Sequence, residues 1–340
     1  MKTNPTYPIM KKLPLSVFAL CVAVLLQGCD HKGGATANGP TPSPKKLRLA
    51  FVGSSSSDYW SIVQLGCEQG ARYLGDVDLS FRVPAELTAK AQQEIVSALV
   101  ADGVDGIAIS PIDAEDQTEF LNHIAAKTLL VCADSDAEKS QRTCYLGTDN
   151  VAAGTQAAEL VKAALPQGGK IILFVGYPNA QNTKDRIQGL QTGLAGSNIQ
   201  IIDTLTDGHN SVTAHANVQS ALTKFPDAAG LIGLYGYHGP AILAAVRSAG
   251  KAGQVKIVCF DEYSDTLAGI AAGDIYGSVV QKPLKLGYET IIRMEKYVRG
   301  DETQFAGRKI LFDSRTVTKD NVAAFQARLN SFMHQKAPEE

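Results

Sequence analysis

Short hydrophobic runs alternate with amphipathic stretches along most of the chain, from Leu47 onward. The runs are rich in β-branched and aliphatic residues, as expected of buried strands, whereas the stretches between them repeat apolar residues at helical spacing. The first set predicts strands over 47–52, 77–83, 104–109 and 129–133, and helices over 59–74, 88–101 and 114–126. The second set, after Asn150, predicts strands over 170–175, 199–205, 230–234, 255–260 and 275–280, and helices over 151–165, 184–194, 212–224, 240–249, 266–271 and 283–298.

This alternation predicts an α/β fold. Strands and helices at this spacing form right-handed βαβ units, in which helices cover both faces of a parallel sheet. The 340-residue chain is too long for a single hydrophobic core, so two doubly wound lobes are expected. In open sheets of this kind, ligands bind beyond the carboxyl ends of the strands. The residues that follow each strand are therefore the candidates for a binding site.

The N-terminal sequence predicts that the protein is exported from the cytoplasm. Two lysines precede an apolar run over 15–26, which is shorter than the about 20 residues of a membrane-spanning helix. A signal peptide over 1–29 is therefore expected, and its last residues, Leu-Gln-Gly-Cys29, resemble the lipobox of bacterial lipoproteins, in which the cysteine is lipidated. The alternative is an ordinary signal peptide with a chance cysteine. Asp30 resembles an inner-membrane retention signal, and the Gly/Pro/Thr/Ser-rich segment 30–46 predicts a flexible tether.

The net charge and the cysteines bear on nucleic-acid binding, disulfide formation and metal binding. The net charge is −2 and no basic run follows the tether, which argues against a nucleic-acid partner. Cys132 and Cys144 flank one loop, so a disulfide and two buried free thiols are both open alternatives in an oxidising compartment. Cys67 and Cys259 lie in different predicted lobes and are not expected to pair. None of these cysteines has metal-ligand spacing, and neither a metal nor another cofactor is expected.

The first set of strands is followed by aromatic and acidic residues. Ser57, Tyr59 and Trp60 open the helix after the first strand, and flat aromatic faces suit the C–H faces of a sugar ring. A core role for one of the two aromatic residues is the alternative. Asp134 and Asp136 follow the fourth strand, where carboxylates accept strong hydrogen bonds from hydroxyls or, alternatively, cap a helix.

The second set of strands also ends in polar and aromatic residues. The candidates are Asn182, Lys184 and Arg186 after its first strand, His209 after its second, Tyr237 and His238 after its third, Asp261 after its fourth, and Gln281 at the end of its fifth. Hydrogen-bonding groups beside aromatic rings indicate a site for a small polyhydroxylated ring. The sequence contains no P-loop, no dinucleotide fingerprint, no H-E-x-x-H and no nucleophile elbow, so binding is favoured over catalysis.

Several stretches resemble the ribose-binding-protein-like family of periplasmic sugar-binding proteins, over 47 to about 325. The similar stretches are Ser57–Trp60 with Gly66, Val104–Pro111, Asp134, Tyr145–Gly154, Arg186 with Gly189 and Leu190, Phe260–Glu262, and Val279–Pro283. The resemblance implies a type I periplasmic binding protein, in which two doubly wound parallel-sheet lobes are joined by a three-segment hinge. The first lobe would hold 47–149 and 282–311, the second 150–281 and 312–340, with crossings near 148–150, 281–283 and 312–315.

The resemblance also implies roles for individual residues. Tyr59 and Trp60 would sandwich the sugar, Asp134 and Asp261 would accept hydrogen bonds from its hydroxyls, and Gln281 would bond near the hinge.

For three other residues of the family's binding site, the matching position in this chain is not fixed to a single residue. The family's arginine in the second lobe falls at Lys184 or Arg186, of which Arg186 is preferred. Its ligand asparagine falls at Tyr237 or His238, and its loop aromatic falls near His209.

Three departures bear on specificity. Ser57 stands where asparagine is common, Ser135 stands where ribose binders place an arginine, and Tyr237-His238 replaces the usual amide. Ribose itself is therefore not the expected ligand, although a sugar is. Related regulators carry an N-terminal helix-turn-helix, whereas a signal peptide and tether are expected here, so a regulator is not expected.

The expected function is capture of a monosaccharide by a monomer in the periplasm, lipid-anchored to the inner membrane, for delivery to an ABC permease in that membrane. A sugar or autoinducer sensor for a chemoreceptor or histidine kinase is the alternative, and a periplasmic sugar-processing enzyme is less favoured.

Overall fold

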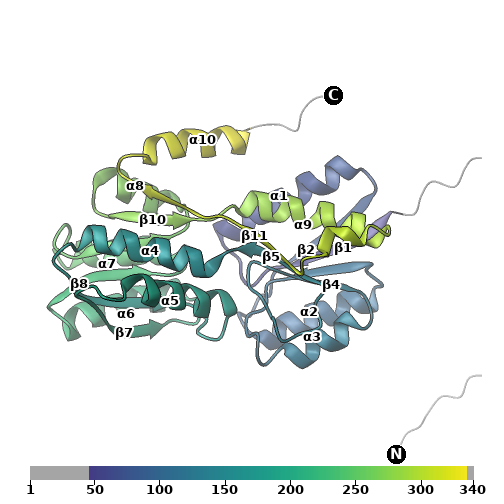
Figure 1. Ribbon diagram of the computed structural model, residues 1–340, viewed down its shortest axis with the longest axis horizontal. Helices are drawn as coiled ribbons and strands as arrows, with labels where there is room; N and C mark the ends of the chain where they lie inside the picture. The colour runs from purple at the N-terminus through teal and green to yellow at the C-terminus, as the bar shows by residue number, and fades with distance from the viewer. Residues whose placement is uncertain (1–45, 335–340) are drawn as a thin grey trace, which may run out of the picture. The chain divides into compact units, whose positions relative to one another are not determined.

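The computed structural model describes residues 46–334, which form two six-stranded sheets, each covered by helices (Figure 1). The prediction of two α/β lobes with mostly parallel sheets is confirmed. The predicted signal peptide, Cys29 and nearly all of the predicted tether lie outside the described residues. Within 46–334, none of the helices is long and apolar enough to cross a membrane.

The first lobe is built on a sheet with strand order β11-β5-β4-β3-β1-β2, in which all neighbours are parallel. Its strands are β1 (Leu47–Val52), β2 (Val77–Arg82), β3 (Gly106–Ile109), β4 (Leu129–Ala133), β5 (Cys144–Thr148) and β11 (Lys309–Phe312). Its helices are α1 (Asp58–Leu74), α2 (Ala89–Ala101), α3 (Thr118–Ala125), α9 (Pro283–Val298) and the short 3₁₀ helix η1 (Glu302–Phe305). Successive strand residues point to opposite faces, so the sheet separates two apolar clusters.

The second lobe repeats this strand order as β12-β10-β9-β8-β6-β7. Its strands are β6 (Gly169–Val175), β7 (Ile199–Thr206), β8 (Ala228–Gly233), β9 (Lys256–Phe260), β10 (Gly277–Val280) and β12 (Arg315–Thr318). Its helices are α4 (Asn150–Ala164), α5 (Gln181–Leu194), α6 (Ser211–Lys224), α7 (His238–Ser248), α8 (Ser264–Ala272) and α10 (Val322–His334). Only β12 runs antiparallel to its neighbour, at the edge of the sheet.

Five elements were not among the predicted ones, namely β5, β11, β12, α10 and η1. The three strands have only four or five residues each. The two edge strands β11 and β12 also mix exposed and buried positions, so neither forms a continuous apolar run. Such short segments give little periodicity to read from a sequence.

The chain passes between the two sheets at three points: from β5 to α4, from β10 to α9, and from β11 to β12. Two of these crossings are tied together by a hydrogen bond, in which Thr148 Oγ1 donates to Gln281 Oε1 over 2.8 Å. The third crossing lies in Asp313 and Ser314, the only two residues between β11 and β12. Short parallel connections of this kind allow rigid lobes to rotate about a hinge.

Each lobe has one pair of helices that cross in close contact at glycines. In the first lobe, α1 and α9 meet at Gly66 and Gly287; in the second, α4 and α5 meet at Gly154 and Gly189 (Figure 1). A Cβ atom at Gly189 would lie 2.0 Å from the carbonyl oxygen of Val151. These helix pairs therefore require glycine because a side chain would push the backbones apart.

The four cysteines of the described part of the chain are buried and free. Cys132 and Cys144 lie on neighbouring strands, where Cys132 pairs with Tyr145 and Cys144 pairs with Val131. This register places the two sulfurs in different apolar clusters, on opposite faces of the sheet. A bond between them would have to pass through the sheet, so the disulfide alternative is wrong and the free-thiol alternative is correct.

Candidate functional site

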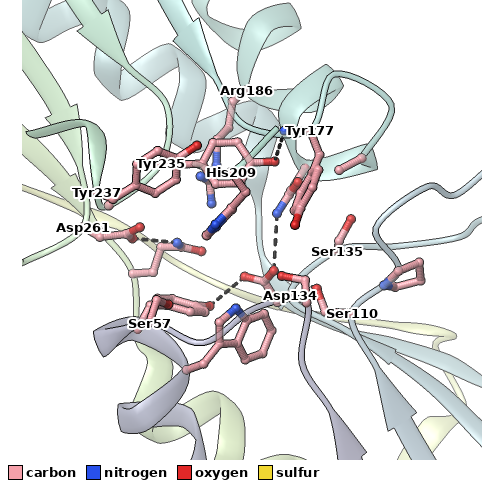
Figure 2. Close-up of a pocket in the computed structure, with 18 of the residues that line it drawn as sticks. Ser57, Ser110, Asp134, Ser135, Tyr177, Arg186, His209, Tyr235, Tyr237 and Asp261 are labelled. Carbon is pink, nitrogen blue, oxygen red and sulfur yellow. Dashed lines mark hydrogen bonds between the residues drawn. The ribbon is translucent and has the colours of Figure 1, made fainter. Parts of the chain in front are cut away.

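A cavity lies at the carboxyl ends of the strands and is lined by both lobes (Figure 2). Its lining residues are Ser54, Ser57, Tyr59, Trp60, Ser110, Pro111, Asp134 and Ser135 from the first lobe, and Tyr177, Ala180, Asn182, Arg186, His209, Tyr235, Gly236, Tyr237, Asp261 and Tyr263 from the second, with Gln281 at a crossing. Of the predicted binding residues, only Asp136, Lys184 and His238 do not line it. The rule that ligands bind beyond strand ends thus located most of this cavity.

Asp134 is the most extensively hydrogen-bonded acid in the cavity. It follows β4 in a left-handed backbone conformation (φ 67°) and is only 6% exposed. One carboxylate oxygen accepts from Tyr59 Oη over 2.7 Å, and the other accepts from Ser110 Oγ over 3.0 Å and Asn182 Nδ2 over 3.3 Å. Burial raises the pKa of Asp134, while the charge of Arg186 and the hydrogen bonds from Tyr59 and Ser110 oppose the rise.

Asp261 occupies the same position in the second lobe, directly after β9, with φ 65°. It accepts a hydrogen bond from Gln281 Nε2 over 2.7 Å, and Gln281 in turn accepts from Thr148 at the neighbouring crossing. Burial also raises the pKa of Asp261, again opposed by Arg186. This carboxylate is therefore linked through one amide to the segments that join the lobes.

Arg186 supplies the positive charge that both aspartates share. Its guanidinium is 4.5 Å from the centre of the Phe260 ring, and the residue is only 2% exposed. Nε donates to Asn150 Oδ1 over 2.9 Å and Nη1 donates to the carbonyl of Leu234 over 2.6 Å. Since a guanidinium has five N–H donors, donors remain for a ligand in the cavity.

The aromatic residues of the first lobe do not form the predicted sandwich. The rings of Tyr59 and Trp60 are in edge contact, with centroids 5.2 Å apart and planes at 89°. Trp60 is 4% exposed and also packs on Phe51, so it belongs partly to the core of the lobe. No flat ligand fits between two perpendicular rings in contact, and the sandwich prediction is wrong for this pair.

The second lobe carries more aromatic surface than was predicted. His209 stacks on Tyr177 with centroids 5.2 Å apart and an interplanar angle of 20°, and it also packs on Tyr237 at 4.6 Å. Burial lowers the pKa of His209 to about 4, so its ring is neutral at pH 7. Its Nε2 lies 3.4 Å from Ser55 Oγ of the first lobe.

Asp136 and Lys184 take part in ion pairs instead of lining the cavity. Arg142 binds both carboxylate oxygens of Asp136, with Nη2 2.6 Å from Oδ2, and both side chains are buried. Lys184 lies 3.5 Å from Glu115 of the first lobe, with 37% of its side chain exposed. The structure does not bring these two predicted residues into the cavity, because each pairs with a charged protein side chain.

His238 is placed behind the cavity, not in it. Its Nδ1 accepts from the backbone N–H of Tyr235 over 3.1 Å, and its Nε2 lies 2.7 Å from Asp207 Oδ2. The residue is fully buried, and burial lowers its pKa although Asp207 opposes this. Of the two predicted alternatives, Tyr237 lines the cavity, while His238 positions the loop that carries it.

Several lining residues were not among the predicted site residues. Ser110 directly follows β3, and Ser135 is the second residue after β4. Tyr177 and Tyr235 are likewise the second residues after β6 and β8. The strand-end rule would have found them had it been applied to every strand alike. Within residues 46–334, no group of three or more His, Cys, Asp or Glu side chains is arranged to hold a metal ion.

The chain is similar to known proteins over most of its length. It is 23% identical over 212 residues to the ribose import binding protein RbsB of Salmonella typhimurium, covering 62% of this chain and 71% of that one. It is 24% identical over 327 residues to the fructose import binding protein FruE of Bifidobacterium longum, covering 90% of this chain and 95% of that one.

One solved structure is similar to this chain in both fold and sequence. The ABC transporter solute-binding protein of Burkholderia graminis, solved in complex with D-arabinose, is 26% identical, with a TM-score of 0.77 and coverage of 84% of this chain and 99% of that one. A family model described as periplasmic binding protein domain matches residues 49–302. The chain therefore belongs to the periplasmic binding protein domain family.

Proposed function

We propose that this protein captures a monosaccharide in the cavity between its lobes and delivers it to an ABC importer. The observation that carries the proposal is the pairing of two buried carboxylates, Asp134 and Asp261, with one buried guanidinium and with aromatic rings from both lobes. Relatives named for ribose and fructose import, and the related protein solved with D-arabinose, support it.

The chemistry of the cavity matches a ring that carries several hydroxyls. Hydroxyls donate to the two carboxylates and accept from Arg186, and such charge-assisted hydrogen bonds are stronger than neutral ones. The aromatic rings of Tyr59, Trp60 and His209 cover apolar C–H groups and exclude water. Micromolar affinity corresponds to about 8 kcal/mol, which one covered ring and a few charge-assisted bonds supply.

Binding is coupled to the approach of the lobes. Asn182 Nδ2 reaches Asp134 of the other lobe over 3.3 Å, and Asn179 Nδ2 reaches Asp113 over 2.8 Å. A sugar that bonds both lobes adds contacts which exist only when they are together, and a ligand shifts a conformational equilibrium only by such differential contacts. The closed surface is then what the permease recognises.

The place of action is the periplasm, and we propose that a lipid on Cys29 anchors the monomer to the inner membrane. The apolar run before Cys29 and the lipobox-like residues support this. Changing Cys29 to Ser is expected to move the protein from the membrane fraction to the soluble periplasmic fraction. A variant that still sediments with membranes, like the parent, would refute the anchor.

Tryptophan fluorescence and calorimetry test the sugar assignment. Trp60 is the single tryptophan and lines the cavity, so sugar binding should shift its emission. A panel of pentoses, hexoses and polyols should include at least one ligand that binds and is recovered chemically unchanged. If no member of the panel binds or shifts the emission, the proposed function is wrong. Conversion of the bound sugar would instead indicate an enzyme.

A further inference from the structure

Three buried polar atoms in the cavity have no hydrogen-bond partner among residues 46–334. They are Ser135 Oγ, Tyr177 Oη and Asn182 Oδ1, and their residues are 2%, 8% and 6% exposed. All three residues line the cavity, one from the first lobe and two from the second. In Figure 2, Ser135 and Tyr177 lie on the side of the cavity away from Asp261.

Ser135 and Tyr177 lie on the same side of the cavity in Figure 2, and a hydrogen bond ties Asn182 to the residue before Ser135. Asn182 Nδ2 donates to Asp134, and Ser135 is the next residue after Asp134. With its amide nitrogen committed to Asp134, Asn182 presents its oxygen as an acceptor. The hydroxyls of Ser135 and Tyr177 both donate and accept. Buried polar groups are rarely left without partners, so this cluster points to a group that both donates and accepts hydrogen bonds.

The walls beside this cluster are apolar. Pro111 and Ala180 line the same cavity, and Tyr177 and Ala180 pack with Ile112 of the first lobe in a small hydrophobic cluster. A ligand group that fits here therefore has an apolar stem and a hydroxyl at its tip. The exocyclic hydroxymethyl group of a hexose has this composition, whereas a ring hydroxyl has no stem of its own.

The charge of the cavity indicates that the group is neutral. Arg186 is the one positively charged side chain among the described lining residues, and it already faces both Asp134 and Asp261. His209 is neutral at pH 7. A carboxylate or phosphate on the sugar would meet two carboxylates and no cation of its own, which disfavours sugar acids and sugar phosphates.

We propose that Ser135, Tyr177 and Asn182 form a subsite for the exocyclic hydroxymethyl group, so that the protein selects hexopyranoses over the corresponding pentopyranoses. This inference rests on the proposed function, because it assumes that the cavity holds a monosaccharide. Ser135 contributes from one lobe and Tyr177 and Asn182 from the other, so the hydroxymethyl group also bridges the lobes. Selectivity and closure thus depend on the same group.

Matched sugars that differ only in this group test the proposal. D-glucose and D-xylose, D-galactose and L-arabinose, D-mannose and D-lyxose, and D-allose and D-ribose are four such pairs. Calorimetry on the full chain should show that, in the pair that binds most tightly, the hexose binds at least about tenfold more tightly than the pentose, the size expected from one or two added hydrogen bonds.

Two variants locate the effect. Tyr177→Phe and Ser135→Ala remove unpartnered hydroxyls, so both should fold with unchanged or higher melting temperature without sugar. Each should weaken hexose binding several-fold and leave pentose binding unchanged. Tyr276→Phe, at an exposed tyrosine, is the matched control and should change neither.

These measurements distinguish failure of the hydroxymethyl subsite from failure of sugar binding as a whole. A pentose that binds as tightly as its hexose partner, or a Tyr177→Phe variant that weakens both sugars equally, would overturn the subsite while sugar binding stands. If none of the eight sugars binds, the subsite fails, and the proposed function fails with it only if no other member of the panel of pentoses, hexoses and polyols binds either.

Discussion

Asp134 and Asp261 occupy equivalent places in two lobes of identical strand order, yet their surroundings differ. Three protein side chains donate to Asp134, and one of them, Asn182, comes from the opposite lobe. Asp261 accepts from a single side chain, Gln281, at a crossing between the lobes. The backbone N–H of Gly236 also donates to Asp261, which gives this carboxylate two donors against three at Asp134. A carboxylate has about four acceptor sites, so Asp261 keeps more capacity for a ligand. We therefore expect Asp134 to contribute more than Asp261 to the contact between the lobes, and Asp261 to contribute more than Asp134 to the proposed binding of sugar.

The largest expected effect comes from removing the charge that both aspartates share. Arg186→Leu leaves two buried carboxylates without a cation and should lower the free energy of unfolding by about 3–5 kcal/mol at pH 7. Because the pKa values of Asp134 and Asp261 are already raised, the variant should lose less stability at acidic pH, where both are protonated. Denaturant unfolding at several pH values measures this.

The control for this change is Arg247→Leu, because Arg247 pairs with Asp274 at the surface and its side chain is 51% exposed. Exposed ion pairs contribute about 0–1 kcal/mol. Equal losses from the two variants would show that Arg186 does not bear on the buried aspartates.

The next effect compares the aspartates directly. Asp261→Asn should weaken sugar binding by about ten- to a hundredfold, the cost of one charge-assisted hydrogen bond, and leave the unliganded protein nearly as stable. Asp134→Asn should instead lower stability by about 1–3 kcal/mol, because its new amide group faces three donors. Calorimetry and thermal unfolding on both variants separate the roles. The reverse pattern would contradict the assignment of the two aspartates.

The helix pairs test whether the lobes are also equivalent in their packing. Gly66→Ala places a Cβ against the carbonyl of Leu284 in the first lobe, and Gly189→Ala does the same against Val151 in the second. Each should cost about 1–3 kcal/mol of stability by overpacking. Gly307→Ala, where the nearest atom would be 3.6 Å from the new Cβ, is the control and should be nearly neutral. Strongly unequal losses would break the correspondence between lobes.

The smallest expected effect is the pH dependence of stability that His209 of the second lobe contributes. Burial lowers the pKa of His209 from 6.5 to about 4, so the folded protein favours the neutral ring. Its contribution to stability is complete above pH 6.5 and is lost as the pH falls toward 4, by about 1 kcal/mol for a half-buried ring. His209→Gln should remove this part of the acid sensitivity. The raised carboxyl pKa values act in the opposite direction, so the difference between the two proteins is the quantity to measure.

The sequence was informative where one local pattern decides the structure. Long apolar runs predicted most strands, and the residues after them included Asp134, Arg186 and Asp261. It was less informative where a distant partner decides. The residues directly around Asp134 and Asp136 do not distinguish them, because the orientation of Asp136 depends on Arg142, in the loop two residues before β5.

The orientation of aromatic rings was likewise beyond the local pattern. Tyr59 and Trp60 are adjacent in sequence, but their perpendicular arrangement depends on Phe51 and on the hydrogen bond from Tyr59 to Asp134. The faces on which Cys132 and Cys144 lie depend on the register between β4 and β5, since a shift of β5 by one residue would place both on the same face. Packing and register are properties of the assembled sheet.

Each lobe contains at least one buried cysteine whose alkylation would report the unfolding of that lobe. Burial raises the pKa of Cys144 to about 11, and Cys67, Cys132 and Cys259 are also fully buried, so alkylating reagents have almost no thiolate to attack in the native protein. Cys259 lies in the second lobe and the other three in the first. Pulsed alkylation followed by peptide mass analysis would therefore show which lobe opens first under denaturant, without any engineered label.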